Sequence, residues 1–302
     1  MITEDPAAFL AAFAALAPAG RQATARAAFL VTPADFSLAA ESAGDNRYMD
    51  LGLAVDPARA VLEHAELARR LGADLPVASF PGDAVAPDGI FPNNVFATVP
   101  GRLVIGRMRH AVRQREAERG DIRAWLIDLL GYEEHRLPAG CVAELTGSLV
   151  IDRARNVGYC GLSERCDRAG ARAMHEAFGL DLTLCFELAA GEYHTNVVLA
   201  VLAGRAAIVA PDGFADARVP AAIARAYAGR AVVIDRAQKA AFAANAIALS
   251  PRRAWMSTRA RGALQAGQLD VLAAAGFEIG AVVLDEIEKA GGSLRCCVAE
   301  IF

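Results

Sequence analysis

Short apolar runs that are typical of β-hairpins recur along this chain at intervals of about 50 residues. They start at Val95, Leu149, Val197, Ile247 and Cys296, so successive starts are 54, 48, 50 and 49 residues apart. Two apolar runs joined by a turn such as Pro100-Gly101 or Gly204 indicate a hairpin. A regular period of this length predicts a repeat architecture, in which each unit buries its faces only against its neighbours.

Helical patterns fill the intervals between these hairpins. They are REAERGDIRAWLIDLLG, DRAGARAMHEAFG, VPAAIARAYAG and TRARGALQAGQLDVLAAAG. A further helix, DPARAVLEHAELARRLGA, precedes them, with Asp56 as its N-cap before Pro57, and a strand, AFLVTP, opens the series near Phe29. We therefore predict a single α/β domain over residues 29–302, with its units arranged around a centre, after an N-terminal helical extension over residues 1–28. An ordinary α/β sheet with coincidental spacing is the alternative that the pattern leaves open.

Composition and charge exclude several classes of protein. The formal net charge of -4 lacks the basic character of a nucleic-acid-binding protein. No run of about 18 apolar residues is present, so no membrane span is expected. Glu4, Asp5 and Pro18 favour an amphipathic helix over a signal peptide at the N-terminus, so we expect a cytoplasmic protein. The six cysteines are then reduced, and without a CxxC pair no metal site is predicted.

Polar residues gather at the start of each predicted hairpin. They are FPNN at 91–94, ELTGS at 144–148, EYHTN at 192–196, Asn245, and Arg295 with Cys296. If the strands radiate from one axis, these side chains meet at one end of it. A thiol such as Cys296 becomes nucleophilic when a base such as His194 is near, and an acid such as Glu144 can orient the imidazole. Turn residues and a core histidine are the alternative reading, which the pattern alone leaves open.

At these residues the chain resembles the guanidino-group-modifying enzymes, which include arginine deiminases, dimethylarginine dimethylaminohydrolases, amidinotransferases, arginine dihydrolases and citrulline hydrolases. The hydrolase branch ends in a Gly-Gly-rich loop, then Arg-Cys and a short strand, which GGSLRCCVAEIF resembles. The resemblance extends from about Phe29 to Phe302. It implies the pentein fold, a five-bladed α/β propeller of ββαβ units with pseudo-fivefold symmetry, in a single domain.

The resemblance also implies roles for individual residues. Cys296 would be the nucleophile, and Cys297 would point to the opposite face of the last strand, because side chains alternate along a strand. ELTGSLV resembles the acidic loop of the family and EYHTNVVL its histidine loop. Glu144 would then be the acid that pairs with the catalytic histidine, and His194 the general acid and base.

The substrate-binding residues follow from the same comparison. CGLSERCD and MRHAVRQRE resemble segments whose arginines bind the substrate carboxylate, which implies Arg165 and Arg113. Deiminases have Asp where this chain has Asn94 and Asn196, and commonly Asp where it has Ser148. Arg295, which directly precedes Cys296, is the last of the expected substrate-binding residues, together with Asn94, Asn196 and Ser148.

A neutral ureido group needs hydrogen-bond donors and acceptors rather than opposite charge, and Asn offers both. The resemblance therefore implies a cysteine hydrolase without metal or cofactor, which converts citrulline or arginine to ornithine, carbon dioxide and ammonia. An arginine deiminase or a dimethylarginine dimethylaminohydrolase that stops at citrulline is an alternative, and a catalytically silent binding or regulatory relative is another. The expected partner is a small amino-acid substrate. The oligomeric state stays open, with a homodimer as one option.

Overall fold

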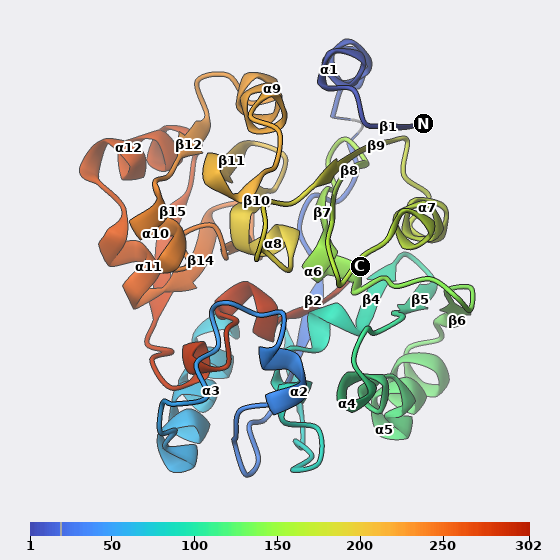
Figure 1. The fold of residues 1–302 in the computed structure, drawn as a ribbon, viewed down its shortest axis with the longest axis vertical. Helices are drawn as coiled ribbons and strands as arrows, with labels where there is room; N and C mark the ends of the chain where they lie inside the picture. Colours follow the sequence, from blue (N-terminus) through green and yellow to red (C-terminus); the bar gives the residue numbers. More distant parts are fainter. Residues whose placement is uncertain (19) are drawn as a thin grey trace.

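The strands of the protein form five small sheets around the middle of the molecule (Figure 1). The structure, a computed structural model, describes residues 1–18 and 20–302. Within this part of the chain, no helix combines the length and the apolar character needed to cross a membrane.

Four of the five sheets follow one plan along the chain. An antiparallel hairpin is followed by one or more helices, and a third strand then pairs in parallel with the second strand of the hairpin. These sheets contain β4 (Phe96–Val99), β5 (Arg102–Ile105) and β6 (Glu133–Arg136); β7 (Leu149–Asp152), β8 (Val157–Leu162) and β9 (Leu182–Glu187); β10 (Leu199–Leu202), β11 (Ala206–Val209) and β12 (Ala231–Val233); and β13 (Ile247–Ala248), β14 (Arg253–Ser257) and β15 (Glu278–Val282). The predicted ββαβ units and the pentein-type architecture are confirmed.

Helices on the outside of the ring connect the second and third strands of these sheets. They are α4 (Ala111–Gln114), α5 (Gly120–Ala124), α7 (Arg168–Ala177), α9 (Arg218–Ala226), α11 (Thr258–Ala263) and α12 (Ala266–Ala274). Helix α10 (Arg236–Ala240) instead lies between β12 and β13, at the passage from one unit to the next. On α7, Ala171, Met174 and Ala177 face the core at helical spacing, whereas Arg172 and Glu176 are exposed. A parallel strand pair needs such a crossover, and the amphipathic helix covers the sheet that it crosses.

The fifth sheet joins two segments that are far apart in the sequence. Strand β16 (Ala299–Ile301) pairs antiparallel with β2 (Ala27–Val31), with Ala299 opposite Phe29, and β2 pairs in parallel with β3 (Val77–Phe80). Helix α3 (Pro57–Leu71) connects β2 to β3, and Asp56 caps it as predicted. The sequence pattern predicted that the last apolar run is a hairpin of its own, and this prediction is wrong. The run supplies the missing strand of the first unit and so completes the ring.

The N-terminal residues pack against the third unit. Strand β1 (Ile2–Thr3) pairs in parallel with β9, and helix α1 (Pro6–Ala14) follows it. Phe9 and Phe13 on α1 are buried and lie edge-on to Tyr159 and Tyr227, with ring centroids 5.6 and 5.7 Å apart. Figure 1 shows α1 beside α9 at the rim of the ring.

Single helical turns precede the first strand of several units and meet near the centre of the ring. They are η2 (Pro92–Asn94), α6 (Leu145–Ser148), α8 (Thr195–Val198) and η7 (Leu294–Cys297). Figure 1 shows α6 and α8 close to the centre, at the ends of β7 and β10. These turns carry the polar residues that the sequence predicted to meet.

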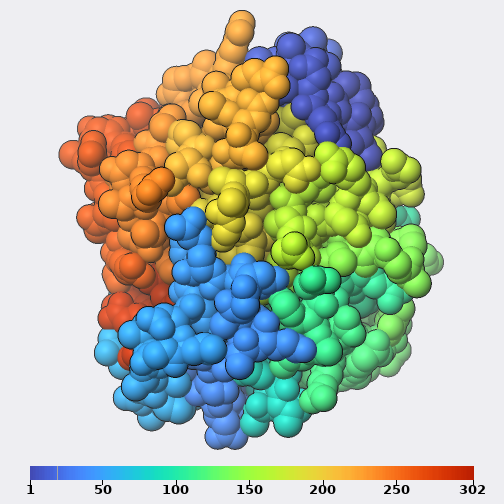
Figure 2. Space-filling model, viewed as in Figure 1, coloured from blue at the N-terminus to red at the C-terminus, as the bar shows by residue number. Residues whose placement is uncertain are grey.

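A long connection between β2 and α3 lies over the same end of the ring. We call residues 36–56 the covering segment; it contains one short helix, α2 (Ala40–Ala43). Figure 2 shows this part of the chain, in blue, lying across the front of the molecule between its neighbours. The centre of the ring is therefore shielded on that side.

Candidate active site

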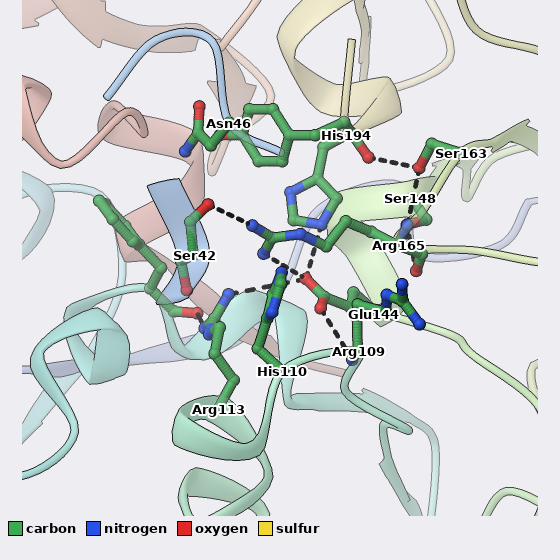
Figure 3. Close-up of polar contacts among 12 residues, drawn as sticks. Ser42, Asn46, Arg109, His110, Arg113, Glu144, Ser148, Ser163, Arg165 and His194 are labelled. Atoms are coloured by element: carbon green, nitrogen blue, oxygen red, sulfur yellow. Dashed lines mark hydrogen bonds and ion pairs between the residues drawn. The ribbon is translucent and has the colours of Figure 1, made fainter. Parts of the chain in front are cut away.

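Glu144 is contacted by several of the polar residues at the centre of the ring (Figure 3). Its side chain is fully buried just before α6. It accepts hydrogen bonds from Nε2 of His194 (2.9 Å), from Nη1 of Arg165 (3.3 Å) and from the backbone N–H of Arg109 (3.2 Å). Nη1 of Arg113 lies 3.7 Å away. Burial alone would raise the pKa of Glu144, but Arg165, His194 and Arg113 outweigh it and hold the pKa well below its usual range, so the group is a carboxylate.

His194 is a buried imidazole whose two nitrogens have different surroundings. Because Nε2 faces the ionised carboxylate of Glu144, it carries the proton and Nδ1 keeps a lone pair. Nδ1 has no hydrogen-bond partner among residues 1–18 and 20–302. Burial lowers the pKa of His194, and Glu144 only partly offsets this effect. The resting imidazole is therefore neutral and able to accept a proton.

Gly147 provides the space that this imidazole occupies. A Cβ atom at Gly147 would overlap Oδ1 of Asn94 and would lie 2.8 Å from Cε1 and 2.9 Å from Nδ1 of His194. These separations are shorter than any ordinary carbon contact. The absence of a side chain at this position thus allows Asn94 and His194 to approach the same turn.

Cys296 and Cys297 lie in the turn η7, before the last strand begins. Sγ of Cys296 accepts a hydrogen bond from Nδ2 of Asn245 (3.2 Å) and lies 3.8 Å from Oδ1 of Asn196. Sγ of Cys297 instead donates to the carbonyl of Ser293 (3.5 Å) within the core. The two thiols do diverge, but the expected reason was wrong. Successive residues in a 3₁₀ turn are about 120° apart, and strand alternation plays no part.

The thiol of Cys296 is protonated in the resting site. Burial raises its pKa, and the hydrogen bond from Asn245 only partly opposes that effect. A thiolate therefore has to form when a proton acceptor comes within reach. Nδ1 of His194 is an unoccupied acceptor in the same buried region.

Cys296 borders a small cavity of about 10 Å³. The other lining residues are Ser42, Asn46, Asp88, Phe91, Asn94, Arg113, Arg165, Tyr193 and Ala290. This volume holds one water molecule at most, since about 10–15 Å³ is needed for one. The structure therefore represents a closed site, and an amino-acid ligand requires the covering segment to move.

Arg165 and Arg113, for which the resemblance implied binding of the substrate carboxylate, both line this cavity. Nε of Arg165 donates to the carboxylate of Asp45 in the covering segment (3.0 Å), and Nη2 donates to the carbonyl of Ser42 (3.0 Å). Arg113 forms a two-point ion pair with Glu116, with distances of 3.0 and 2.8 Å. Each guanidinium is thus already matched by a carboxylate of the protein.

Asp88 is a lining residue that the sequence analysis did not identify. Its side chain is almost fully buried, and Oδ1 has no hydrogen-bond partner in the described part of the chain. Burial raises its pKa, and Arg113 only partly offsets the effect. An unsatisfied buried carboxyl group is costly, so its position at a ligand cavity is informative. Its only signal in the sequence is an acidic residue inside the apolar stretch AVAPDGIF.

Three of the remaining predicted residues, Asn94, Asn196 and Ser148, lie at the site. Asn94 lines the cavity, and Asn196 donates from Nδ2 to the carbonyl of Thr146 (3.2 Å) while Oδ1 faces the thiol. Ser148 donates to the backbone carbonyl of Arg165 (3.3 Å), so it holds the segment that carries that arginine.

Arg295 is not brought together with the other predicted residues. It turns away from Cys296, and its guanidinium donates to the carbonyl of Val298 (2.8 Å) and to Glu300 (3.0 Å). Because the two neighbours lie in a 3₁₀ turn, their side chains point in different directions. Within the described residues, no group of three or more His, Cys, Asp or Glu side chains is placed to hold a metal ion.

Comparisons with known proteins agree with this geometry. A family model described as "N,N dimethylarginine dimethylhydrolase, eukaryotic" matches residues 32–302. A search among curated proteins finds no match.

Several solved structures share the fold. The N-terminal domain of ArgZ, an arginine dihydrolase from the ornithine-ammonia cycle in cyanobacteria, is 20% identical with a TM-score of 0.79, and the match covers 91% of this chain and 97% of that domain. AgrE, in a complex with ornithine and NAD+, is 20% identical to this chain with a TM-score of 0.79, but the match covers only 39% of the AgrE chain. A dimethylarginine dimethylaminohydrolase with an S-methyl-L-thiocitrulline adduct is 19% identical with a TM-score of 0.71, and 91% and 99% of the two chains are covered.

Proposed function

The chain belongs to the N,N dimethylarginine dimethylhydrolase family, and on this basis we propose that it hydrolyses the ureido or guanidino group of an arginine-like amino acid through a covalent thio-intermediate. Family membership establishes a hydrolase of carbon–nitrogen bonds in amidines or guanidines. An arginine dihydrolase and a dimethylarginine dimethylaminohydrolase share the fold, so the fold does not decide between one and two hydrolytic steps.

The observation that carries the proposal is the buried Glu144–His194 pair, at 2.9 Å, in the same centre as the thiol of Cys296. In the proposed reaction the proton of Cys296 passes to Nδ1 of His194, and the thiolate attacks the central carbon of the substrate. His194 returns the proton to the departing nitrogen. Water then attacks the thio-intermediate, with His194 as the base, and the thiol is restored.

Glu144 supports this sequence in two ways. It fixes the tautomer of His194 that leaves Nδ1 free, and it stabilises the imidazolium that forms when the proton is taken up. Both effects require an ionised carboxylate, which agrees with its lowered pKa.

The amino-acid end of the substrate has matching groups in the cavity. Arg165 and Arg113 present guanidinium groups suited to an α-carboxylate. Asp88 presents a carboxyl oxygen without a partner, which suits an α-ammonium group. Opposite charges at these positions favour a free α-amino acid over a ligand such as agmatine, which lacks the carboxylate.

Neutral amides surround the thiol and favour a neutral reacting group. Asn94 borders the cavity, and Asn196 and Asn245 contact Sγ of Cys296 directly. The negative charge on Glu144 is already engaged by His194 and Arg165. We therefore propose citrulline as a substrate in its own right, with one water consumed and ornithine, carbon dioxide and ammonia released.

Steady-state ammonia release with citrulline, arginine, methylarginines and agmatine tests this proposal. We expect turnover of citrulline and little turnover of agmatine, and Asn94→Asp should shift the preference toward arginine. Efficient arginine turnover with no citrulline turnover would refute the ureido substrate. A catalytically silent protein would release no ammonia from any of them, and its Cys296 would not be protected by substrate from a thiol-reactive probe.

A further inference from the structure

A second cavity lies inside the ring, on the other side of the turns that carry the active-site residues. Its volume is about 40 Å³, and Thr146 and Asn196 lie at its inner end. The inner strands of four units form its wall, through Val150 on β7, Val201 on β10, Ala248 on β13 and Glu300 on β16, among others. The cavity is therefore the axial channel of the ring, and Asn196 separates it from the thiol of Cys296.

Two arginines and one carboxylate supply the charge of this channel. Arg295 donates from Nη2 to Glu300 (3.0 Å) and from Nη1 to the carbonyl of Val298 (2.8 Å), so its charge is matched. Arg153 also lines the channel. Together these side chains carry a net charge of about +1, since arginine stays protonated and carboxylates are ionised near neutral pH.

The charge of Arg153 has no opposite charge paired with it among the described residues. Its guanidinium stacks on the ring of Phe302, 4.1 Å from the centroid, and lies 5.6 Å from the ring of Phe178. No hydrogen bond or ion pair joins it to the described residues; it lines the channel and is partly exposed, so water is what meets its N–H groups. Burial lowers its pKa to about 10, Glu300 offsets part of the effect, and Arg295 adds to it. Such a cation has only water as an acceptor, and a bound anion could replace that water with a charged acceptor.

We propose that the axial channel binds one small carboxylate-type monoanion between Arg153 and Arg295. A single negative charge balances the net charge of the channel. A dianion would leave an excess of negative charge beside Glu300. The planar fork of a guanidinium matches a planar two-oxygen group, and the small volume limits the ligand to the size of bicarbonate or a short carboxylic acid. This site is distinct from the cavity at Cys296 and does not depend on which substrate is turned over.

Calorimetric titration of the full-length protein with sodium bicarbonate, acetate, chloride and sulfate, at constant ionic strength, tests the proposal. We expect bicarbonate or acetate to bind more tightly than chloride or sulfate, and the comparison of the two tells which kind of carboxylate fits. Arg153→Met removes the charge and keeps an apolar side chain on Phe302, and binding should weaken about tenfold or more. Arg252→Met, on an exposed loop, makes the same change in net charge and should bind as the wild type does.

Glu300→Gln provides a test that loss of folding cannot imitate. It raises the net charge of the channel, so binding of the monoanion should tighten and binding of sulfate should appear. Equal binding by the wild type and Arg153→Met would overturn the proposal, as would tighter binding of chloride or sulfate in the wild type. Absence of binding by all four anions up to high millimolar concentrations would overturn it as well.

Discussion

Replacing Gly147 with alanine tests whether the imidazole of His194 must stay where it is found. The added methyl group would overlap Oδ1 of Asn94 and lie 2.8 Å from Cε1 of His194. The backbone of α6 is held by its neighbours in the centre of the ring, so the strain is relieved mainly by the two side chains. His194 then has to move by several tenths of an ångström and its bond to Glu144 weakens.

The expected loss of activity exceeds the expected loss of stability. Adding a methyl group to a packed core costs about 1–3 kcal/mol. A displacement of about 1 Å at a reacting group can lower the rate about 10²-fold, and complete loss of a positioned acid or base lowers it by about 10²–10⁴-fold. We therefore expect a protein that still folds but has lost about two orders of magnitude in kcat.

The assay is kcat for ammonia release, with the thermal midpoint measured on the same preparation. Gly262→Ala is the matched control, because a Cβ at Gly262 meets no atom within 4 Å and this position lies within α11. It should keep full activity and gain slightly in stability, since alanine is the better helix former. Wild-type kcat in a folded Gly147→Ala would refute the reasoning, because His194 would then have tolerated the added group.

Three further predictions concern single side chains. Cys296→Ser should abolish ammonia release while Cys297→Ser keeps most of it, and the reverse result would move the nucleophile to Cys297. His194→Ala should lower kcat by about 10²–10⁴-fold with a cooperative thermal transition retained, whereas loss of that transition would assign a structural role to this histidine. Asp45→Asn should lower KM, since the Asp45 carboxylate competes with a substrate carboxylate for Arg165. Burial would raise the pKa of Asp45, but Arg165 and His110 together hold it below its usual value. The stabilisation is therefore present above the unfolded pKa and is lost as pH falls through the folded pKa. The protection of backbone amides in the covering segment, measured against their intrinsic exchange rates, should therefore fall below about pH 4 in the wild type and show no such step in Asp45→Asn.

The periodic part of the fold could be predicted because each unit repeats a local signal. Hairpin turns such as Pro100-Gly101 and helix caps such as Asp56 are set by residues close in sequence, and the repeat then fixes how the units meet. The pairing of β16 with β2 has no such signal, since its partners are distant along the chain. The last apolar run was therefore interpreted as a hairpin.

The residues of the candidate site likewise could be predicted only where they belong to a local motif. Glu144 and His194 belong to recognisable local motifs at repeat positions, and the structure brings them together at 2.9 Å. Asp88 and Asp45 lie in irregular stretches without periodicity, so nothing in the sequence indicated that they would meet Arg113 and Arg165. The direction of Arg295 depended on a turn of 3₁₀ helix where a strand was expected.

The pairing of β16 with β2 also links the chemistry to the long-range closure of the chain. Cys296 is held in place by a three-residue strand whose partner lies near the other end of the sequence. Closing so long a loop carries an entropic cost, and a strand this short forms few bonds to repay it. Burial supplies the rest, because Val298, Ala299 and Ile301 are almost fully buried in the core, and well-buried segments open only with the whole fold. On heating, the nucleophile should therefore stay in place until the chain unfolds globally, so that activity and tertiary structure are lost together.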